Sequence, residues 1–483
     1  MRVSWDSNSA VIWKISDKRK GRENMKRKKW LALGLTAALV MSPVTGVYAQ
    51  ESDDLYETVE SGDYDSNKKS DAKDEVAVQA AENSNIAASG EGITGETGKN
   101  TTVTGNVTTT GEAVDGVTAD GKNTTVTVKG NVTVSGTGSA GVSADNNATV
   151  EVTGNVQAKG DNQTHEGQTG GTYIDKWADG VQADNGSKVT VDGNVTSEKG
   201  RAIDSHGSEV TVNGNVHSEK ESAINARDGS TITIDGSVSS NVGISLGGII
   251  ETTDSTIKIT KDVKAKNAWG ILAGPGTDIE VGGNVSSEKE AVYISGKDAL
   301  IVVDGNVYST KGCAMDILDQ AEATVKGDVT GNKLAAWLDN RSKLQALGKI
   351  SSNDVGILLS LYDAQGTGEF DLGTIDAQTA ISINYGDYKN IEDIIAALPE
   401  MTVYKMNADT LLRLYTGSEG LDSKEVSDLA EKILMEKLQY AIRKQDTSNG
   451  KINIAGELTK AKEGQTLTFS VVANDGYEVD SVS

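Results

Sequence analysis

The densest group of side chains suited to binding or chemistry lies in one stretch, residues 157–179. It contains His165, Glu166, Tyr173, Asp175, Trp177 and Asp179. Tyrosine and tryptophan rings can stack on sugar faces, and carboxylates can accept sugar hydroxyls or bind calcium. The sequence therefore predicts a ligand-binding loop here. The alternative is a solvated loop with one aromatic ring tucked against the body of the protein.

A second pattern places acidic residues at equivalent positions of successive repeats, at Asp192, Asn213 and Asp235. Carboxylates two strands apart would be separated by about 10 Å, a gap that suits the acid and base of an inverting glycosidase. The same position is then filled by Thr260, Gly282, Asp304 and Lys326. Because no catalytic cluster accompanies these acids, we predict no catalytic residues. A carbohydrate-active lyase or hydrolase is the alternative.

Metal and thiol chemistry have little support in the sequence. The three histidines are scattered, and no calcium-binding nonapeptide repeat occurs, so we predict neither a metal site nor a cofactor. Cys313 is the only cysteine, which excludes an internal disulfide. Its place in the repeat predicts a packing role rather than a reactive thiol.

The elements that position these side chains form a repeat. Three short apolar patterns recur in order: a small residue before an aliphatic one, then V-x-V or I-x-I, then Gly-Asn-Val. Their recurrence interval is 21–25 residues, except for 39 residues between Gly154 and Gly193. The insertion in that long interval is the stretch rich in candidate site residues.

Alternating runs of three to five residues between Gly, Asn, Asp and Ser are typical of strands and turns. A fixed period indicates one unit stacked on itself. The sequence therefore predicts an all-β fold, a parallel β-helix over residues 89–388 with three faces and roughly twelve coils of about 22 residues.

Two columns of stacked residues form the predicted core. The first is Val117, Val142, Val181, Ile203, Ile224, Ile244, Ile271, Val292, Met315, Trp337, Ile357 and Ile381. Each follows Gly or Ala, which predicts a tight corner. The second is Val128, Val152, Val191, Val212, Ile234, Ile259, Val281, Val303 and Val325, and its β-branched side chains suit a strand interior.

An asparagine column follows the glycine of the third pattern. It comprises Asn106, Asn131, Asn155, Asn194, Asn215, Asn284 and Asn306. We expect a left-handed backbone at these residues, because asparagine tolerates it better than most, and this would bend the chain between two faces. We also expect the stacked amides to hydrogen-bond from coil to coil.

The 22-residue coil, the aliphatic stacks and the turn with asparagine resemble right-handed parallel β-helix proteins of the pectate-lyase-like superfamily. The resemblance covers residues 89–385. It implies a right-handed helix and an extracellular carbohydrate or adhesion context. It does not imply an enzyme, because many such proteins are passengers and adhesins.

The sequence predicts an export signal and a linker at the start of the chain. Residues 25–49 combine a basic run, a short apolar run and Val47-Tyr48-Ala49, which predicts a signal peptide cleaved after Ala49. An N-terminal membrane anchor is the alternative, and residues 1–24 are read as an upstream extension. Residues 50–88, acidic and poor in large apolar side chains, predict a disordered linker.

The chain carries a formal charge of −24, and residues 50–483 hold 36 basic against 67 acidic residues, a net charge of −31. This charge argues against binding nucleic acid or anionic lipid. No later stretch is long and apolar enough to predict membrane insertion of the mature chain.

Beyond the repeat, residues 389–447 predict a helical cap or connector. One helix ends at Pro399, and a longer one over 424–445 is capped by Asp422 and Ser423. A coiled-coil partner helix is the sharper alternative for the second. Residues 451–483 resemble the start of a B-repeat-like module of bacterial surface proteins, which we expect to be incomplete in this chain.

These features predict a secreted or cell-surface bacterial protein that acts as a stalk or adhesin-like binding scaffold without chemistry. Glycans or a host or cell-surface matrix are the expected partners. An extracellular polysaccharide lyase or glycoside hydrolase is the main alternative. Self-association through open coil ends is a third hypothesis.

Overall fold

The structure is a computed structural model of the whole chain. It describes residues 92–166, 172–241, 248–267, 269–364, 366–416, 421–444, 450–462 and 464–474, and for 248–252 the backbone only. The predicted signal peptide within residues 1–49 and the predicted linker at 50–88 lie outside the described residues.

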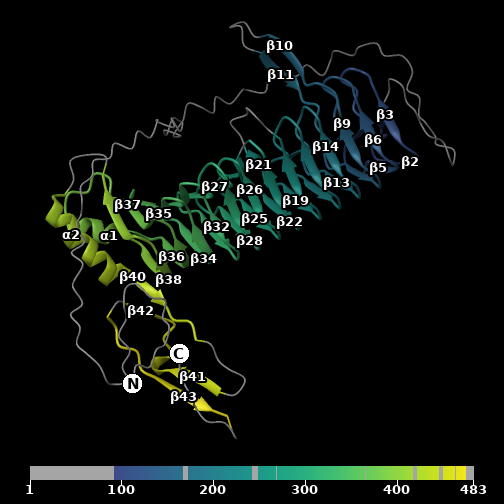
Figure 1. Cartoon of the computed structure of the whole chain (residues 1–483). Coiled ribbons are helices and arrows are strands. Elements are labelled where there is room, and N and C mark those ends of the chain that lie inside the picture. Colours follow the sequence, from purple (N-terminus) through teal and green to yellow (C-terminus); the bar gives the residue numbers. More distant parts are fainter. Residues whose placement is uncertain are drawn as a thin grey trace. The chain divides into compact units, whose positions relative to one another are not determined.

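The fold is a parallel β-solenoid of about 11 turns (Figure 1). A regular turn contributes three short strands, for example β15 (Ile203–His206), β16 (Glu209–Val212) and β17 (Val216–Ser218). Each strand pairs in parallel with its counterparts in the turns before and after. The predicted all-β parallel β-helix is therefore confirmed, with close to the expected number of coils.

Face 1 is a 14-stranded sheet. Its strands are β1 (Ile93–Thr94), β4 (Val117–Asp120), β7 (Val142–Asp145), β12 (Val181–Asp184), β15, β18 (Ile224–Arg227), β21 (Gly248–Thr252), β24 (Trp269–Ala273), β27 (Val292–Ser295), β30 (Met315–Leu318), β33 (Leu334–Asp339), β35 (Val355–Ser360), β37 (Thr379–Asn384) and β39 (Thr410–Tyr415).

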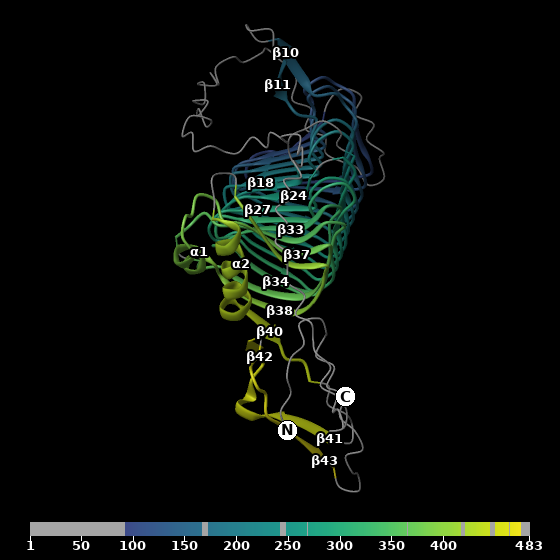
Figure 2. The same ribbon diagram turned by 60° about the vertical axis from the view of Figure 1, so that its left-hand side comes forward.

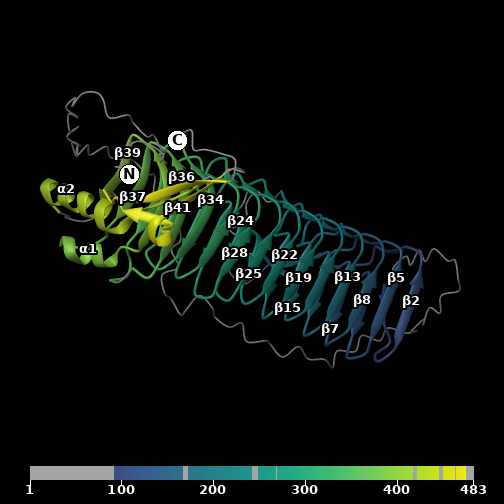
Figure 3. The ribbon, with the colours of Figure 1, turned by 90° about the horizontal axis from the view of Figure 1, so that it is seen from below.

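The strands of face 2 lie side by side in Figure 3, where they can be followed from β2 to β34. Its strands are β2 (Asn100–Thr104), β5 (Thr125–Lys129), β8 (Thr149–Val152), β13 (Lys188–Val191), β16, β19 (Thr231–Ile234), β22 (Thr256–Ile259), β25 (Asp278–Val281), β28 (Leu300–Val303), β31 (Glu322–Val325), β34 (Lys343–Ser351), β36 (Glu369–Asp376) and β38 (Glu400–Asn407).

Face 3 joins face 2 in one larger sheet, because the long strand β34 pairs with strands of both faces. Its strands are β3 (Val107–Thr109), β6 (Val132–Val134), β9 (Val156–Ala158), β14 (Val195–Ser197), β17, β20 (Val238–Ser240), β23 (Val263–Ala265), β26 (Val285–Ser287), β29 (Val307–Ser309) and β32 (Val329–Thr330).

The core forms because like residues meet along the stack. Ile203 is in register with Ile224, and Val210 with Ile232, and all four side chains are fully buried. Alternation along each strand sends the intervening side chains outward. Burying each aliphatic side chain stabilises the fold by roughly 1.5–3 kcal/mol.

Two members of the first predicted column were wrong. Trp337 is not in the column, because Ala336 is the residue in register with Met315 and Ile357. The indole points outward instead, and its Nε1 donates to Ser360 Oγ at 3.0 Å. Ile244 lies outside the described residues, and Ile250 holds the register between Ile224 and Ile271.

The asparagine column forms the expected ladder between coils. Asn194 Oδ1 accepts the backbone N–H of Asn215 at 2.7 Å, and Asn155 Oδ1 accepts that of Asn194 at 2.8 Å. The predicted left-handed backbone was wrong for this column. The left-handed asparagines and aspartates lie at the other corner, between faces 1 and 2, as at Asn185 (φ 52°) and Asp228 (φ 61°).

Close backbone approach explains the glycines of the third pattern. A Cβ added to Gly214 would lie 2.5 Å from the carbonyl oxygen of Gly193 on the coil before. Real Cβ contacts are not this short, so the residue before the asparagine bend must lack a side chain here.

Helices α1 (Ile391–Ala397) and α2 (Ser423–Lys432) lie beside the last turns (Figure 2). Asp422 caps α2 in a capping box with Glu425, as the sequence predicted for its start. The predicted helix to residue 445 was too long. A short π-helix (Ile433–Lys437) follows α2, and β40 (Leu438–Ala441) then pairs with β38.

The solenoid also extends past residue 388, because β38 and β39 continue faces 2 and 1 inside the predicted helical connector. Further on, β41 (Gly450–Ile454) pairs antiparallel with β43 (Phe469–Ala473), and β42 (Lys460–Lys462) with β40. None of the helices in the described segments has the length and apolar character needed to span a bilayer.

Candidate functional site

The insertion between Gly154 and Gly193 is a β-hairpin rather than an irregular loop (Figure 1). Strands β10 (Gln163–Glu166) and β11 (Thr172–Lys176) pair antiparallel, with His165 opposite Tyr173. Their rings stack with centroids 5.7 Å apart and planes 22° apart. His165 Nδ1 also lies 2.5 Å from Asp175 Oδ1. The structure thus brings three of the six predicted residues together, and we call His165 and Tyr173 the hairpin platform.

The hairpin platform is exposed, but the base of the hairpin is tied to the solenoid. Tyr173 is 53% exposed. Lys176 Nζ lies 3.0 Å from Asp115 Oδ1 on an earlier turn, and Asn162 Oδ1 accepts the N–H of Ala178 at 2.9 Å. Glu166, also predicted, is exposed opposite Thr172 and away from these contacts.

Trp177 and Asp179 belong to a different arrangement, next to face 1. The Arg201 guanidinium lies over the Trp177 ring, 4.7 Å from its centroid. The same guanidinium lies 2.9 Å from a carboxylate oxygen of Asp179 and 2.9 Å from one of Asp204. Trp177 therefore packs on the flank of the solenoid, which is the alternative that the sequence left open for one aromatic residue.

The two acids beside Arg201 have pKa values shifted in opposite directions. Burial raises the pKa of Asp179 to about 7, although the charge of Arg201 opposes the shift. Burial also pushes the pKa of Asp204 upward, yet His206 and Arg201 outweigh it and hold that pKa below its usual range. The hydrogen bond to Asp204 raises the pKa of His206. The two carboxyls that share one guanidinium therefore have separated pKa values.

A neutral acid beside an ionised one is the arrangement of many acid–base pairs. Access decides against that role here. The Asp179 side chain is 2% exposed, and its oxygens are occupied by the guanidinium and the backbone N–H of Arg201. The pair is placed to hold the corner of the turn rather than to meet a substrate.

The aspartate column, in the turns that directly follow the face 2 strands, makes surface hydrogen bonds between coils. Asn213 Nδ2 donates to Asp192 Oδ1 at 2.9 Å, and Thr260 Oγ1 donates to Asp235 Oδ1 at 2.9 Å. The amide of Asn213 stands in the column between the two carboxylates, where an inverting enzyme would hold its water. This geometry does not favour the glycosidase interpretation.

Sequence reasoning missed a carboxyl on the outer surface of face 1. Asp316 is in register with Tyr293 on one side and Trp337 on the other; we call these three residues the Asp316 site. The Asp316 side chain is buried, at 8% exposure, and its Oδ1 has no hydrogen-bond partner among the described residues. Trp269 stacks on Tyr293, with centroids 5.8 Å apart.

A signal for the Asp316 site does exist in the sequence. The residue after each first-column core residue must point outward in a strand, and here this set includes Asp204, Asn225, Tyr293 and Asp316. This outward set mixes acidic, amide and aromatic side chains, so no hydrophobic periodicity marks it in the sequence.

Face 3 carries a groove that the sequence also did not predict. It has a volume of about 480 Å³, and its lining includes His217, Lys264, Ser286 and Tyr308. Tyr308 is 40% exposed. These residues lie on neighbouring strands in the outward positions, so the groove follows the stacking direction of the solenoid.

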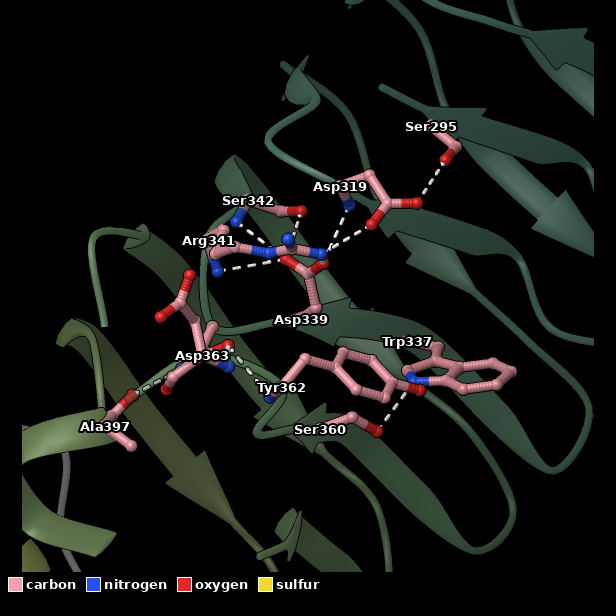
Figure 4. A network of polar contacts seen from close by, with 11 residues as sticks. Ser295, Asp319, Trp337, Asp339, Arg341, Ser342, Ser360, Tyr362, Asp363 and Ala397 are labelled. Atoms are coloured by element: carbon pink, nitrogen blue, oxygen red, sulfur yellow. Dashed lines mark hydrogen bonds and ion pairs between the residues drawn. The ribbon is translucent and has the colours of Figure 1, made fainter. Parts of the chain in front are cut away.

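A buried polar network closes the corner after β33 (Figure 4). Asp339 accepts hydrogen bonds from the backbone N–H groups of Asp319, Arg341 and Ser342 and from the Ser342 hydroxyl. The neighbouring Asn340 side chain donates to the carbonyls of Asp363 and Ala397, and so ties α1 to the turn. Every partner is internal, which indicates a structural role.

No protein-family model matches the chain, and no curated protein or solved structure is detectably similar to it. Within the described segments, no three His, Cys, Asp or Glu side chains lie close enough to hold a metal ion. A functional assignment therefore depends on the geometry of the sites described above.

The pH dependence of stability is expected to report on Asp316. Burial raises the pKa of Asp316 from 3.8 to about 7, with Glu290 adding to the shift and the Cys313 thiol opposing it. The folded state therefore favours the neutral carboxyl. Its stabilisation is complete below pH 3.8 and is lost as the pH rises through about 7.

Asp316→Asn should remove this dependence, because the amide stays neutral. Relative to the variant, the wild type should lose stability on the order of 4 kcal/mol between pH 4 and pH 8. Denaturant unfolding of both proteins at several pH values measures this difference in stability. The titration of Asp179 contributes equally to both proteins and therefore cancels. Parallel pH profiles for the two proteins would contradict the assignment.

Proposed function

We propose that this protein is a secreted or cell-surface scaffold that binds glycans through the hairpin platform and carries out no chemistry. The observation that carries the proposal is the exposed, stacked pair of His165 and Tyr173 rings. Aromatic faces bind sugar rings by stacking, and they lose little conformational entropy when they do. The predicted signal peptide and the tandem coils support export and a stalk-like role.

The anchoring of the hairpin supports a binding surface rather than a passive insertion. The hydrogen bond between His165 and Asp175 fixes one ring, and Lys176 and Asn162 hold the base of the hairpin. A platform fixed before binding has less conformational entropy to lose. An unanchored loop of the same length would bind more weakly with the same side chains.

Tyr173→Ala is expected to lower the affinity for a recognised glycan at least tenfold, roughly the effect of losing one stacked ring. The measurement is glycan- and mucin-array binding, followed by titration of the best ligand. Tyr308→Ala is the matched control, since it removes another exposed tyrosine on a different face.

The control variant should bind like the wild type. His165→Phe should retain most of the binding, because a ring remains in place although the hydrogen bond to Asp175 is lost. Unchanged binding by Tyr173→Ala would remove the hairpin platform from consideration. Loss of binding in Tyr308→Ala instead would move the site to the groove on face 3.

The second candidate function is an extracellular polysaccharide lyase or glycoside hydrolase. Only the separated pKa values of Asp179 and Asp204 favour it. Incubation with polygalacturonate and other uronides should release no product if the scaffold proposal is right. Product release by the wild type that is lost in Asp204→Asn would support the enzyme instead.

A further inference from the structure

The Asp316 site contains a carboxyl group without a counter-charge. Asp316 Oδ1 is buried without a hydrogen-bond partner among the described residues. The groups that influence this carboxyl are Glu290, which is acidic, and the thiol of Cys313. Burying an oxygen that lacks a hydrogen-bond partner costs free energy, because folding removes its hydrating water and supplies no donor in exchange. Such a group in a folded protein calls for a functional explanation.

Aromatic rings flank this carboxyl on both sides. Tyr293 and Trp337 are in register with Asp316 on the adjacent strands β27 and β33, and both are partly exposed. Strand spacing places the two side-chain positions about 10 Å apart, with Asp316 midway. A cation held over Asp316 would be one strand spacing, about 5 Å, from each neighbouring residue position, a separation at which cation–π attraction acts when a ring faces the cation.

Another turn of the solenoid shows a comparable arrangement in which the chain supplies its own cation. Asp204 occupies the outward position of β15 that Asp316 occupies in β30. There, Arg201 supplies the cation: its guanidinium contacts the Asp204 carboxylate at 2.9 Å and lies over the Trp177 ring at 4.7 Å. The Asp316 site has the carboxyl and the rings but not the guanidinium.

We infer that the Asp316 site binds an organic cation, an alkylammonium group that sits over Asp316 between Tyr293 and Trp337. A carboxylate with aromatic walls suits a quaternary or primary ammonium group, which gains from ion pairing and from the ring faces together. Anions are disfavoured by Asp316 and Glu290. The site lies apart from the hairpin platform, so the inference is independent of glycan binding.

The titration of Asp316 supports this chemistry. Burial keeps the empty carboxyl largely neutral below pH 7, whereas a bound ammonium group favours the ionised form. Binding should therefore release a proton below pH 7, and affinity should rise with pH until the carboxyl is ionised before binding. Because Oδ1 is buried, the side chains around it must shift as the cation enters.

The experiment titrates the full chain with choline and, separately, with n-butylammonium, by calorimetry at pH 6 and pH 8. Two buffers of different ionisation heat at pH 6 measure proton release. Saturable binding is expected for at least one probe, with higher affinity at pH 8. Tighter binding of choline assigns a quaternary ligand, and tighter binding of butylammonium a lysine-type ligand.

Variants test the placement. Asp316→Asn should weaken binding at least tenfold and abolish the pH effect, and Trp337→Leu should weaken it severalfold. Trp177→Leu is the matched control, because its ring already carries Arg201, and it should bind like the wild type. Circular dichroism verifies the fold of each variant. Saturation by neither probe, or unchanged binding by Asp316→Asn, would overturn the inference.

Discussion

Replacing Ile224 with aspartate is expected to abolish cooperative folding of the central turns. Ile224 is fully buried in β18, in register with Ile203 before it and Ile250 after it. A carboxylate there has neither water nor a counter-charge, and burying such a group costs more than a domain's stability margin. Far-ultraviolet circular dichroism and limited proteolysis measure the loss.

The effect should spread beyond one turn. In a solenoid each turn is stabilised chiefly by its two neighbours, so a failed turn separates the two halves of the stack. Ile224→Ala, a milder change, should cost roughly 2–5 kcal/mol through lost burial and the cavity left behind. Proteolysis of Ile224→Asp should cut first within turns β15 to β21.

Arg227→Ala is the matched control, because Arg227 lies on the same strand with its side chain exposed. It should leave stability within about 0.5 kcal/mol of the wild type. A folded Ile224→Asp protein with wild-type protease resistance would mean that residue 224 does not face the interior, and would contradict the stacked-coil description.

The stacked core was predictable because each turn repeats the same pattern of residue types. Periodicity placed Val210 and Ile232 in one column, and the structure pairs them. One sequence contains many copies of the unit, so register errors in a single coil are corrected by its neighbours. The asparagine hydrogen bonds followed from the same alignment.

The two errors in the core column arose where a coil offers more than one match to its pattern. Two small residues precede Trp337, so the small-plus-apolar pattern can be placed at either of two positions. In the structure, the hydrogen-bond register places the smaller Ala336 in the interior, and the Trp337 indole points outward. Near Ile250 the coil is longer than usual, and again a second apolar match is present.

The candidate site was less predictable, because its contacts join residues that no local pattern links. Arg201 lies on the turn after Trp177 and contacts two acids at once. The insertion length predicted a protruding element, but not the antiparallel pairing that brings His165 onto Tyr173. Polar side chains follow no burial periodicity, so their partners emerge only once the coils are stacked.

The second large effect is expected at Asp339, at the end of β33. Its side chain is fully buried, and its two oxygens accept three backbone N–H groups, the Ser342 hydroxyl and the Arg341 guanidinium. Asp339→Ala would leave those donors without an acceptor in a water-free corner. Removing one partner of a buried charged network costs about 3–5 kcal/mol.

Asp319→Asn provides the matched control in the same corner, because Asp319 has a left-handed backbone (φ 54°) that asparagine tolerates and alanine does not. The Asp319 carboxylate is 57% exposed and pairs with the same Arg341, and an exposed ion pair is worth about 0–1 kcal/mol. Both variants remove an aspartate that contacts one arginine, so burial is the main difference between them. Hydrogen exchange of the amides in β33 to β35 and denaturant unfolding report the local and total losses. Equal destabilisation by the two variants would mean that the contact with Arg341, rather than the buried backbone donors, accounts for the stability that Asp339 contributes. A much larger loss of stability is expected in Asp339→Ala, because backbone N–H groups cannot turn to find another acceptor.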